Sequence, residues 1–276
     1  MSRTEMINRL NELPRIQALL QELLEMVNQE DIDFIALAKK ISMDQVLSAR
    51  LLRMANSAHF GGSKTISSVN DALIRVGIGA VKTLVVASVL SSAFSSVKTL
   101  DMEQYWINTF EVSVIASQLA PLAGVDKNEA FTIGVLHNVG ELMIHSLVPE
   151  QALQIQDRVQ EGMDPFDAQR EILDTTAPAL GGELAANWKF PDLVIDAIAH
   201  CETPEQATKS PQYATLLHFA RDINRSWDIL SDETQKAQFL AQHPDSHSLN
   251  VPATLVAELD AHRGEGKELA MQISAA

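Results

Sequence analysis

Hydrophobic positions along the chain repeat with the spacing of an α-helix and not with that of a β-strand. Between Gln45 and Ala58, for example, the apolar residues Leu47, Leu51 and Met54 fall on one helical face, three or four residues apart. A half-buried strand would instead alternate apolar and polar residues, and two such strands joined by a hairpin turn are not visible in the sequence. The pattern therefore predicts an all-α protein.

Residues that begin and end helices divide the chain into many short segments. Asp33 and Asp44 each precede a periodic apolar segment, as N-cap residues do, and the paired glycines at 61–62 mark a loop. Prolines stand at the expected first turn of several other helices. The predicted helices are 14–27, 34–41, 45–58, 68–77, 78–94, 102–122, 127–147, 149–161, 165–173, 178–188, 191–200, 212–230 and 232–242, followed by a polar loop and two short helices.

The polar stretch Ser95–Asp101 is the predicted boundary between two helical lobes. We expect an N-terminal lobe over residues 1–98, a second lobe over residues 99–207, and a helical extension over residues 208–276 that packs on them. A chain of 276 residues is long enough for one large or two small domains with a sizeable core.

Composition excludes several classes of protein. Hydrophobic residues make up 46% of the chain and charged residues 21%, which is typical of a globular protein and not of a disordered one. The single cysteine, Cys201, excludes an intrachain disulfide. The most apolar stretch, Thr83–Phe94, is shorter than the roughly 20 residues of a membrane-spanning helix, and no secretory signal follows Met1. We expect a cytoplasmic protein without a membrane partner.

Charge is distributed unevenly along the chain. The formal net charge of −15 opposes binding to nucleic acids, but residues 39–98 carry eight lysines and arginines against two aspartates, a net +6, which leaves −21 on the remainder. The basic segment either binds an anionic partner or docks against the acidic part of the same chain. Arg50, Arg53 and Ser57 share the polar side of a predicted helix, so they are candidate interaction residues, with a solvated or internally paired face as the alternative.

Three segments of the sequence carry a family signature in combination. They are Leu47–Gly61 (LSARLLRMANSAHFG), Gly134–Leu142 (GVLHNVGEL) and Gly181–Leu184 (GGEL). Together they resemble the HDOD family of helical signalling modules, which are related to the HD phosphohydrolases, over about residues 13–207. The resemblance implies a two-lobed helical bundle with an HD-like C-terminal lobe, extra C-terminal helices, and a role in bacterial signal transduction.

The positions that would hold metal in an active HD phosphohydrolase are mostly replaced here. The resemblance implies a spaced histidine, a His–Asp pair and a later aspartate, which together bind divalent ions. The matching positions hold Asn108, His137 with Asn138, and, around the place of the late aspartate, Arg221, with Asp222 one step out of register. One positioned histidine contributes roughly 10²–10⁴-fold in rate, whereas phosphate monoester hydrolysis needs up to about 10²¹-fold. We therefore predict a non-catalytic relative with no catalytic, cofactor-binding or metal-binding residues.

An altered set of metal ligands is the alternative. On one continuous helix, His137, Glu141 and His145 lie at i, i+4 and i+8, which makes Glu141 and His145 candidate replacement ligands. About 12 Å of helix axis would separate the two histidines, too far for both to reach one ion. A polar stripe that faces solvent or the other lobe is the simpler interpretation. His243 and His247, in the segment HPDSH, are expected to lie in solvent.

The predicted function is that of a non-enzymatic adaptor in bacterial signal transduction, which binds a signalling protein in trans and needs no cofactor. Whether the chain forms a homodimer stays open. One alternative is a metal-dependent phosphohydrolase that acts on a nucleotide or cyclic dinucleotide with an altered ligand set. A second is a sensor that binds a nucleotide at the basic segment without turnover.

Overall fold

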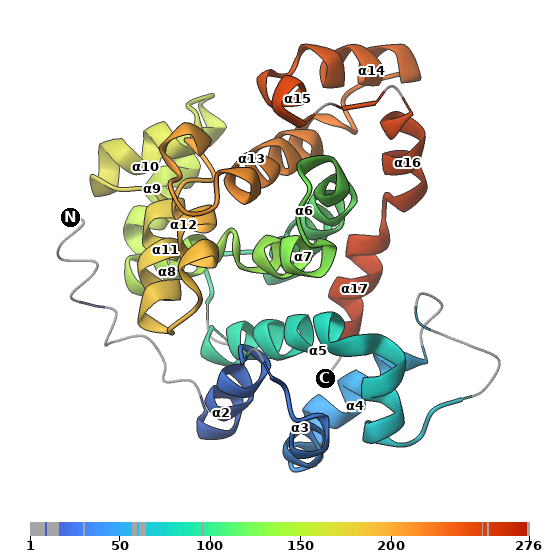
Figure 1. The fold of residues 1–276 in the computed structure, drawn as a ribbon. Coiled ribbons are helices and arrows are strands. Elements are labelled where there is room, and N and C mark those ends of the chain that lie inside the picture. Colours follow the sequence, from blue (N-terminus) through green and yellow to red (C-terminus); the bar gives the residue numbers. More distant parts are fainter. Residues whose placement is uncertain are drawn as a thin grey trace. The chain divides into compact units, whose positions relative to one another are not determined.

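The protein is all-α, as the hydrophobic pattern predicts. A computed structural model describes Arg9, Phe60 and residues 17–29, 31–56, 65–94, 97–249, 251–252 and 254–274. The structure is 76% helical, and the described residues contain no strand (Figure 1). The chain divides into two compact units, of which the larger is built mainly from residues 96–267 and the smaller mainly from residues 15–95. The predicted helix start at Pro14 lies outside the described residues.

Four helices make up most of the described part of the smaller unit, which also includes residues 268–274. They are α2 (Ala18–Val27), α3 (Phe34–Ile41), α4 (Gln45–Ala55) and α5 (Val69–Ala93). α5 contacts each of the other three and supplies more buried side chains than any other helix of this unit. Its second half is buried on nearly all sides, which explains why no polar face was visible in the sequence there.

Helix boundaries in the smaller unit follow the sequence signals. The carboxylate of Asp33 accepts the backbone N–H of Ile35 at 2.9 Å, and that of Asp44 accepts the N–H of Leu47 at 2.8 Å. Both are N-cap bonds that satisfy donors at the start of a helix. Gly77 has φ +77° and interrupts α5 at the predicted junction between two helices. These predicted helix starts and this break are confirmed.

α5 is long and apolar enough to resemble a membrane-spanning helix. Its mean hydropathy reaches 1.9, but 61% of the apolar window is buried inside the protein itself. Because Gly77 interrupts the helix, only residues 78–93 continue beyond it, fewer than the roughly 20 that a span requires. The burial is that of a core helix.

The larger unit is centred on α6, which packs against α7 and α13 (Figure 1). The elements of this part of the chain are α6 (Met102–Ala123), α7 (Lys127–Leu136), α8 (Val139–Leu147), α9 (Pro149–Gln160), α10 (Pro165–Leu173), α11 (Ala177–Asn187), α12 (Asp192–Ala199), the 3₁₀-helix η2 (Pro204–Gln206), α13 (Pro211–Ser226), α14 (Glu233–Gln242), α15 (Pro244–Leu249), α16 (Leu255–His262) and α17 (Glu265–Ser274).

A buried carboxylate holds the turn between α16 and α17 against α6. Glu111 accepts the backbone N–H of Gly264 at 2.9 Å and lies 3.3 Å from Nη1 of Arg263. Burial raises the pKa of Glu111, although the charge of Arg263 opposes the shift. A side chain on Gly266 would bring its Cβ within 2.3 Å of the backbone nitrogen of Glu111. The C-terminal helices therefore depend on this close approach.

Two predictions about the larger unit are wrong. The expected continuous helix over 127–147 is broken, because α7 ends at Leu136 and α8 begins at Val139. The segment after residue 242 is not a loop but the short helix α15, with Ser246 and Leu249 buried. Its polar composition concealed the start signal given by Pro244. The division into segments 1–98, 99–207 and 208–276 stays a prediction.

Candidate functional site

The junction between α7 and α8 is the centre of the candidate site. His137 ends α7, and Asn138 precedes α8, so the predicted pair lies at a bend and not within a helix. Glycines permit close packing on both sides of the bend. A Cβ on Gly134 would lie 2.6 Å from Cα of Ser113, and one on Gly140 would lie 1.9 Å from the carbonyl oxygen of Ala177. Tight backbone packing therefore fixes the position of this pair.

His137 is buried and neutral. Its Nδ1 lies 2.6 Å from the carbonyl oxygen of Gly134, and because a carbonyl only accepts, Nδ1 carries the proton. Burial lowers the pKa of His137 to about 3, and the positive charge of Arg221 acts in the same direction. The imidazole is therefore uncharged at physiological pH and is bonded to its own backbone, without a carboxylate partner.

The two asparagines at the predicted ligand positions are occupied by hydrogen bonds. Nδ2 of Asn138 donates to Oγ1 of Thr109 at 2.9 Å, and this hydroxyl lies 2.7 Å from the carbonyl oxygen of Tyr105. Asn108, which is exposed on α6, accepts a hydrogen bond from Nε2 of Gln104 at 2.9 Å. Neither amide offers the negative charge that a divalent ion would need. The residues at these positions do not fit the metal centre of an HD phosphohydrolase.

The two candidate replacement ligands have different partners. The carboxylate of Glu141 accepts a hydrogen bond from Nε2 of Gln169 at 2.6 Å, and the side-chain oxygen of Gln169 in turn accepts the N–H of Ala177. His145 is buried, with Nδ1 2.8 Å from Oγ1 of Thr99. Burial raises the pKa of Glu141 and lowers that of His145. Because the helix breaks after His137, the stripe expected on one helix does not exist.

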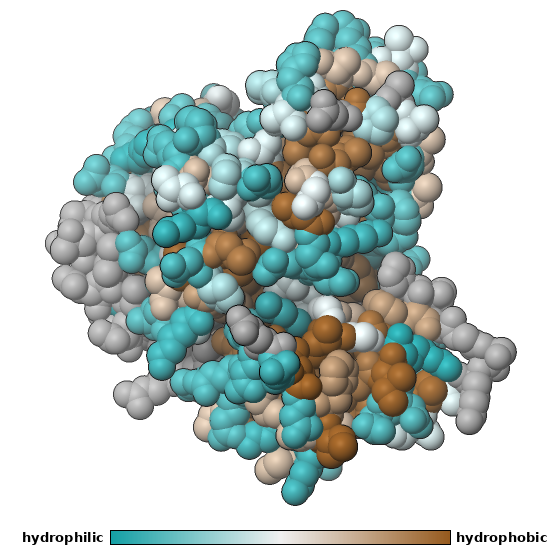
Figure 2. Space-filling model, in the orientation of Figure 1, coloured by the Kyte–Doolittle hydropathy of each residue, from teal (hydrophilic) through white to brown (hydrophobic). Residues whose placement is uncertain are grey.

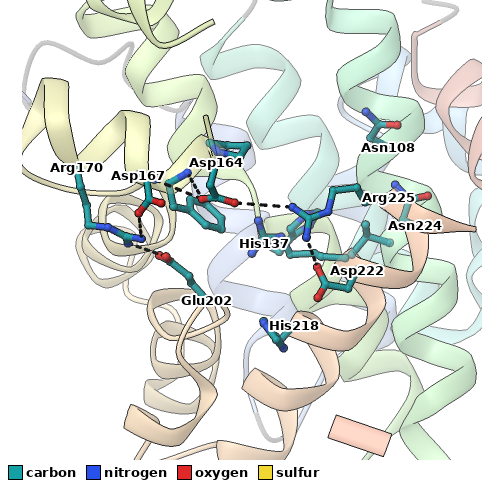
Figure 3. A pocket seen from close by; sticks show the side chains of 14 residues that line it. Asn108, His137, Asp164, Asp167, Arg170, Glu202, His218, Asp222, Asn224 and Arg225 are labelled. Carbon is teal, nitrogen blue, oxygen red and sulfur yellow. Dashed lines mark hydrogen bonds and ion pairs between the residues drawn. The ribbon is translucent and has the colours of Figure 1, made fainter. Parts of the chain in front are cut away.

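An open pocket of about 470 Å³ lies beside His137. Its walls come from α6, α10 and α13, and Glu202 completes them (Figure 3). The pocket is polar, so it is suited to a hydrophilic ligand or a partner's side chain and not to an apolar molecule. Asn108 lines the same pocket, whereas Asn138 is not among the lining residues.

Charged groups in the pocket pair with one another. Arg170 contacts both Asp167, at 3.0 Å, and Glu202, at 2.6 Å, while Arg225 contacts Asp222 at 2.9 Å. Figure 3 shows these pairs on different sides of His137. Exposed ion pairs of this kind contribute little stability, so they are free to exchange partners when a ligand or protein enters.

Arg221 lies where the family resemblance places the late aspartate of an HD phosphohydrolase, with Asp222 one step out of register. Its guanidinium lies over the ring of Phe166, 4.6 Å from the centroid, and Nη1 is 3.5 Å from the sulfur of Cys201. A cation in this place repels a metal ion and lowers the pKa of His137. The substitution seen in the sequence thus reverses the charge of the site.

A second group of histidines lies close to the pocket and was missed by sequence reasoning. Ligand atoms of His218, Asp222 and His243 all lie within 4.8 Å of one another. His243 was expected to lie in solvent, but only 8% of its surface is exposed. His218 and Asp222 are four residues apart on α13, a spacing that places both on one helix face and was the available signal. The position of His243 beside them depends on the tertiary fold.

The predicted basic stripe of the smaller unit is only partly exposed. Arg50 is half-buried, and its Nη1 donates to Oγ of Ser88 on α5 at 3.2 Å. Arg53 is exposed on α4, and Ser57 lies outside the described residues. The contact of Arg50 with Ser88 fits the alternative of an internally paired face, because α5 packs against this side of α4; the role of these residues in binding a partner stays a prediction.

Comparison with known proteins identifies relatives of the whole chain. The family model of the HDOD domain matches residues 13–204. A curated protein of Treponema pallidum, described only as uncharacterized, is 24% identical over 234 residues, which are 84% of this chain and 45% of that protein. The chain thus spans less than half the length of this curated relative.

Solved structures share the fold over nearly the full length. A Shewanella amazonensis protein, provisionally named a phosphohydrolase, is 34% identical with a TM-score of 0.86 and 97% of each chain covered. An HDOD domain protein of unknown function from Geobacter sulfurreducens is 22% identical with a TM-score of 0.80 and 98% of each chain covered. A Marinobacter aquaeolei protein, provisionally named in signal transduction, is 21% identical with a TM-score of 0.78, and the match covers 98% of this chain and 64% of that one.

Proposed function

Because the chain belongs to the HDOD family, we propose that it is a non-enzymatic adaptor in signal transduction that acts by binding another protein. The name of the Marinobacter aquaeolei structure supports the signalling part of the proposal. Because the sequence identity between that protein and this chain is low, the match supports a shared fold but not a shared partner or pathway. The cytoplasm of a bacterium is the proposed setting.

The proposal depends on one observation, the chemistry at the bend between α7 and α8. In place of three oxygen or nitrogen ligands around an ion, the corresponding positions offer a neutral His137, two hydrogen-bonded amides and the cation Arg221. Activation of water for phosphate ester hydrolysis needs a positive centre held by such ligands. Neutral and positive side chains at these positions cannot hold such a metal ion, so the site is suited to recognition and not to turnover.

Exposed apolar residues in the smaller unit provide a surface for a protein partner. Ile35 on α3 is 80% exposed, Met43 before α4 is 67% exposed, and Val46 on α4 is half exposed. Figure 2 shows apolar side chains at the surface over α3 and α4. Large exposed apolar side chains that gather in one region mark interaction sites more often than solvated faces. Lys39 and Arg53 on the same two helices would favour an acidic partner.

The first test measures turnover. Purified full-length chain is incubated with nucleotides and cyclic dinucleotides in the presence of Mg²⁺, Mn²⁺ or Zn²⁺, and product is followed by chromatography. The proposal expects no product above that formed by His137→Ala. Turnover that is lost in this variant would overturn the adaptor function.

The second test measures partner binding. Full-length chain captures proteins from its native host, and mass spectrometry compares wild type with Ile35→Ser/Met43→Ser. We expect a specific partner to be lost by at least tenfold in the double variant. Ile229→Ser is the matched control, since Ile229 is also 80% exposed but belongs to the larger unit. Equal loss in the control, or no loss in the double variant, would exclude this surface.

A metal-dependent phosphohydrolase is the second candidate function. It is favoured by the provisional name of the Shewanella amazonensis structure at 34% identity and by the open polar pocket beside His137. The turnover test above decides between the two. A nucleotide sensor at the basic segment is not favoured, because Arg50 is directed to Ser88 and is half-buried.

A further inference from the structure

We propose that His218, Asp222 and His243 form a binding site for a transition-metal ion such as Zn²⁺, beside the degenerate HD position in the same pocket but with a different set of ligands. The ligand atoms of these residues lie within 4.8 Å of one another. Two ligands on a tetrahedral Zn²⁺ ion are separated by about 3.4 Å, given bond lengths near 2.0–2.1 Å. Small side-chain movements are therefore enough to close the three groups on an ion.

The sequence and fold supply these ligands from two elements. His218 and Asp222 stand four residues apart on the same face of α13, which gives a rigid pair of ligands. His243 comes from the junction of α14 and α15, where the chain turns back toward α13. Imidazole and carboxylate are the ligands that a zinc-like ion takes in proteins when thiolates are absent.

Hydrogen bonds already orient both imidazoles. Nδ1 of His218 lies 2.6 Å from a carboxylate oxygen of Asp245, and this contact leaves Nε2 for an ion. The backbone N–H of Asp245 donates to Nδ1 of His243 at 3.3 Å, so Nε2 of His243 faces Asp222, 3.0 Å away. A carboxylate that accepts the second ring N–H, as Asp245 can from His218, is the usual outer partner of a metal site. At His243 an ion would displace the proton on Nε2, and the ring would then carry its proton on Nδ1, so the contact with the backbone N–H of Asp245 must give way to the Asp245 carboxylate, 3.7 Å from Nδ1.

Negative side chains in the cluster attract a cation, whereas positive side chains near it oppose one. Two carboxylates, Asp222 and Asp245, face two imidazoles, and two cations lie near them: Arg225, which pairs with Asp222, and Arg221, whose charge acts on His218. The carboxylates attract an ion only as far as these arginines move away. Arg225 contacts Asp222 at 2.9 Å, but it also lies 4.0 Å from Asp164 and is exposed. It can therefore move to Asp164 when an ion takes its place at Asp222.

An ion also has a way in. His218 and Asp222 line the open pocket, whereas His243 is buried behind them. Solvent reaches two of the three ligands, which leaves room for a water molecule as the fourth. A bound ion would tie α15 to α13, and this clamp is separate from the protein-binding surface proposed above.

The test starts from full-length protein treated with a chelator and then titrated with Zn²⁺ by calorimetry and with Co²⁺ by visible absorption. We expect one ion per chain, the d–d bands of a low-coordinate Co²⁺ site, and a higher thermal midpoint when Zn²⁺ is present. His218→Gln and His243→Gln should each weaken binding by 100-fold or more. Asp245→Asn, which removes the carboxylate beside Nδ1 of both His218 and His243, should weaken it about 10- to 100-fold.

His247→Gln is the matched control, because His247 is exposed on α15, four residues after His243, and is not one of the cluster's members. It should bind as wild type does. Circular dichroism checks that each variant is folded, and Asp245→Asn keeps the test decisive if a histidine variant is not. A wild-type chain that binds no ion, or binding that persists in both histidine variants, would overturn the site.

The outcomes for the site and for the proposed function are distinct. Bound metal without turnover leaves both proposals standing. Turnover that depends on His218 would overturn the adaptor function and keep the metal site, whereas an absence of both metal and turnover would remove the site alone.

Discussion

His137 and His218, both in the larger unit, have hydrogen-bond partners of different chemistry. His137 donates to a backbone carbonyl, is buried, and has a pKa near 3. His218 is bonded to Asp245, which raises its pKa although burial opposes the shift. A carbonyl partner keeps an imidazole neutral, whereas a carboxylate partner prepares it for a proton or a metal ion. The degenerate position has lost charged chemistry that the neighbouring cluster retains.

The difference also extends to the carboxylates. Asn138 replaces the acid of the His–Asp pair, and Glu141 is held by Gln169 with its pKa raised by burial. Asp222 is half-buried, and burial opposes its ionisation, but the hydrogen bond from His243 and the charges of Arg225, His218 and His243 together outweigh this and lower its pKa. Ionised oxygen is therefore available beside His218 and not beside His137. The comparison teaches that a family motif and a metal-binding chemistry can occupy different places in one fold.

The largest effect is expected from Gly140→Ala, which tests whether packing alone holds the degenerate position. A Cβ at residue 140 would meet the carbonyl oxygen of Ala177 at 1.9 Å, so α8 and α11 must separate. We expect a loss of about 3 kcal/mol or more in the free energy of unfolding, measured in urea. Ser146→Ala on the same helix should change it by less than about 0.5 kcal/mol. A stabilised Gly140→Ala variant would contradict the packing.

The next largest effect is expected from Asn138→Asp, which restores the His–Asp pair. The substitution removes the donor to Thr109 and places a carboxylate against a hydroxyl that already has the carbonyl of Tyr105 as a partner. The expected loss at pH 7 is about 2 kcal/mol. Asn108→Asp, at an exposed position, should cost less than about 0.5 kcal/mol. Stabilisation of Asn138→Asp by added Mn²⁺ would show that the position still forms a metal site.

Acidification should weaken the fold through His137. The folded pKa of about 3 lies below the unfolded value of about 6.5, so the unfolded chain binds a proton first as the pH falls. Between these values the group removes roughly 1.4 kcal/mol of stability per pH unit. The free energy of unfolding of the wild type should fall between pH 6 and pH 4. In His137→Asn this fall should be smaller by roughly 1.4 kcal/mol per pH unit. Equal slopes in both proteins would mean that His137 is accessible to protons in the fold.

His218 should act with the opposite sign in metal-free protein. Its folded pKa is raised by Asp245, so its contribution is fully present below about pH 6.5 and is lost as the pH rises through the folded value. With a chelator present, Asp245→Asn should lower the unfolding free energy by about 1 kcal/mol at pH 6 and by less at pH 9. A larger loss at pH 9 than at pH 6 would contradict the assignment of the pair.

The smallest effect is expected from Arg170→Ala. Arg170 is exposed and pairs with Asp167 and Glu202 at the rim of the pocket. Solvent screens such pairs, so the unfolding free energy should change by less than about 0.5 kcal/mol. A loss above 1 kcal/mol would show that the pocket wall is a structural network and not a surface free to rearrange around a ligand.

Local structure was largely predictable from the sequence. The helix Phe34–Ile41 and the helix Pro165–Leu173 begin and end where the pattern places them, because an aspartate at each N-cap and the apolar period act within one or two turns. The break at Gly77 was predictable for the same reason. The missed break after His137 was not, since no glycine or proline lies at residues 137–138 and the bend depends on packing against α6 and α11.

For the candidate site, too, the identity of the residues was predictable from the sequence, whereas the contacts between them were not. The loss of the metal ligands at Asn108 and Asn138 is a property of residue identity, so the sequence alone determined it. Which groups meet instead depends on contacts between distant segments, such as His243 with Asp222, 21 residues apart along the chain. The local sequence around a histidine in a polar segment is the same whether its side chain lies in solvent or in a buried cluster. Only the fold of α14 and α15 against α13 decides which of the two holds for His243.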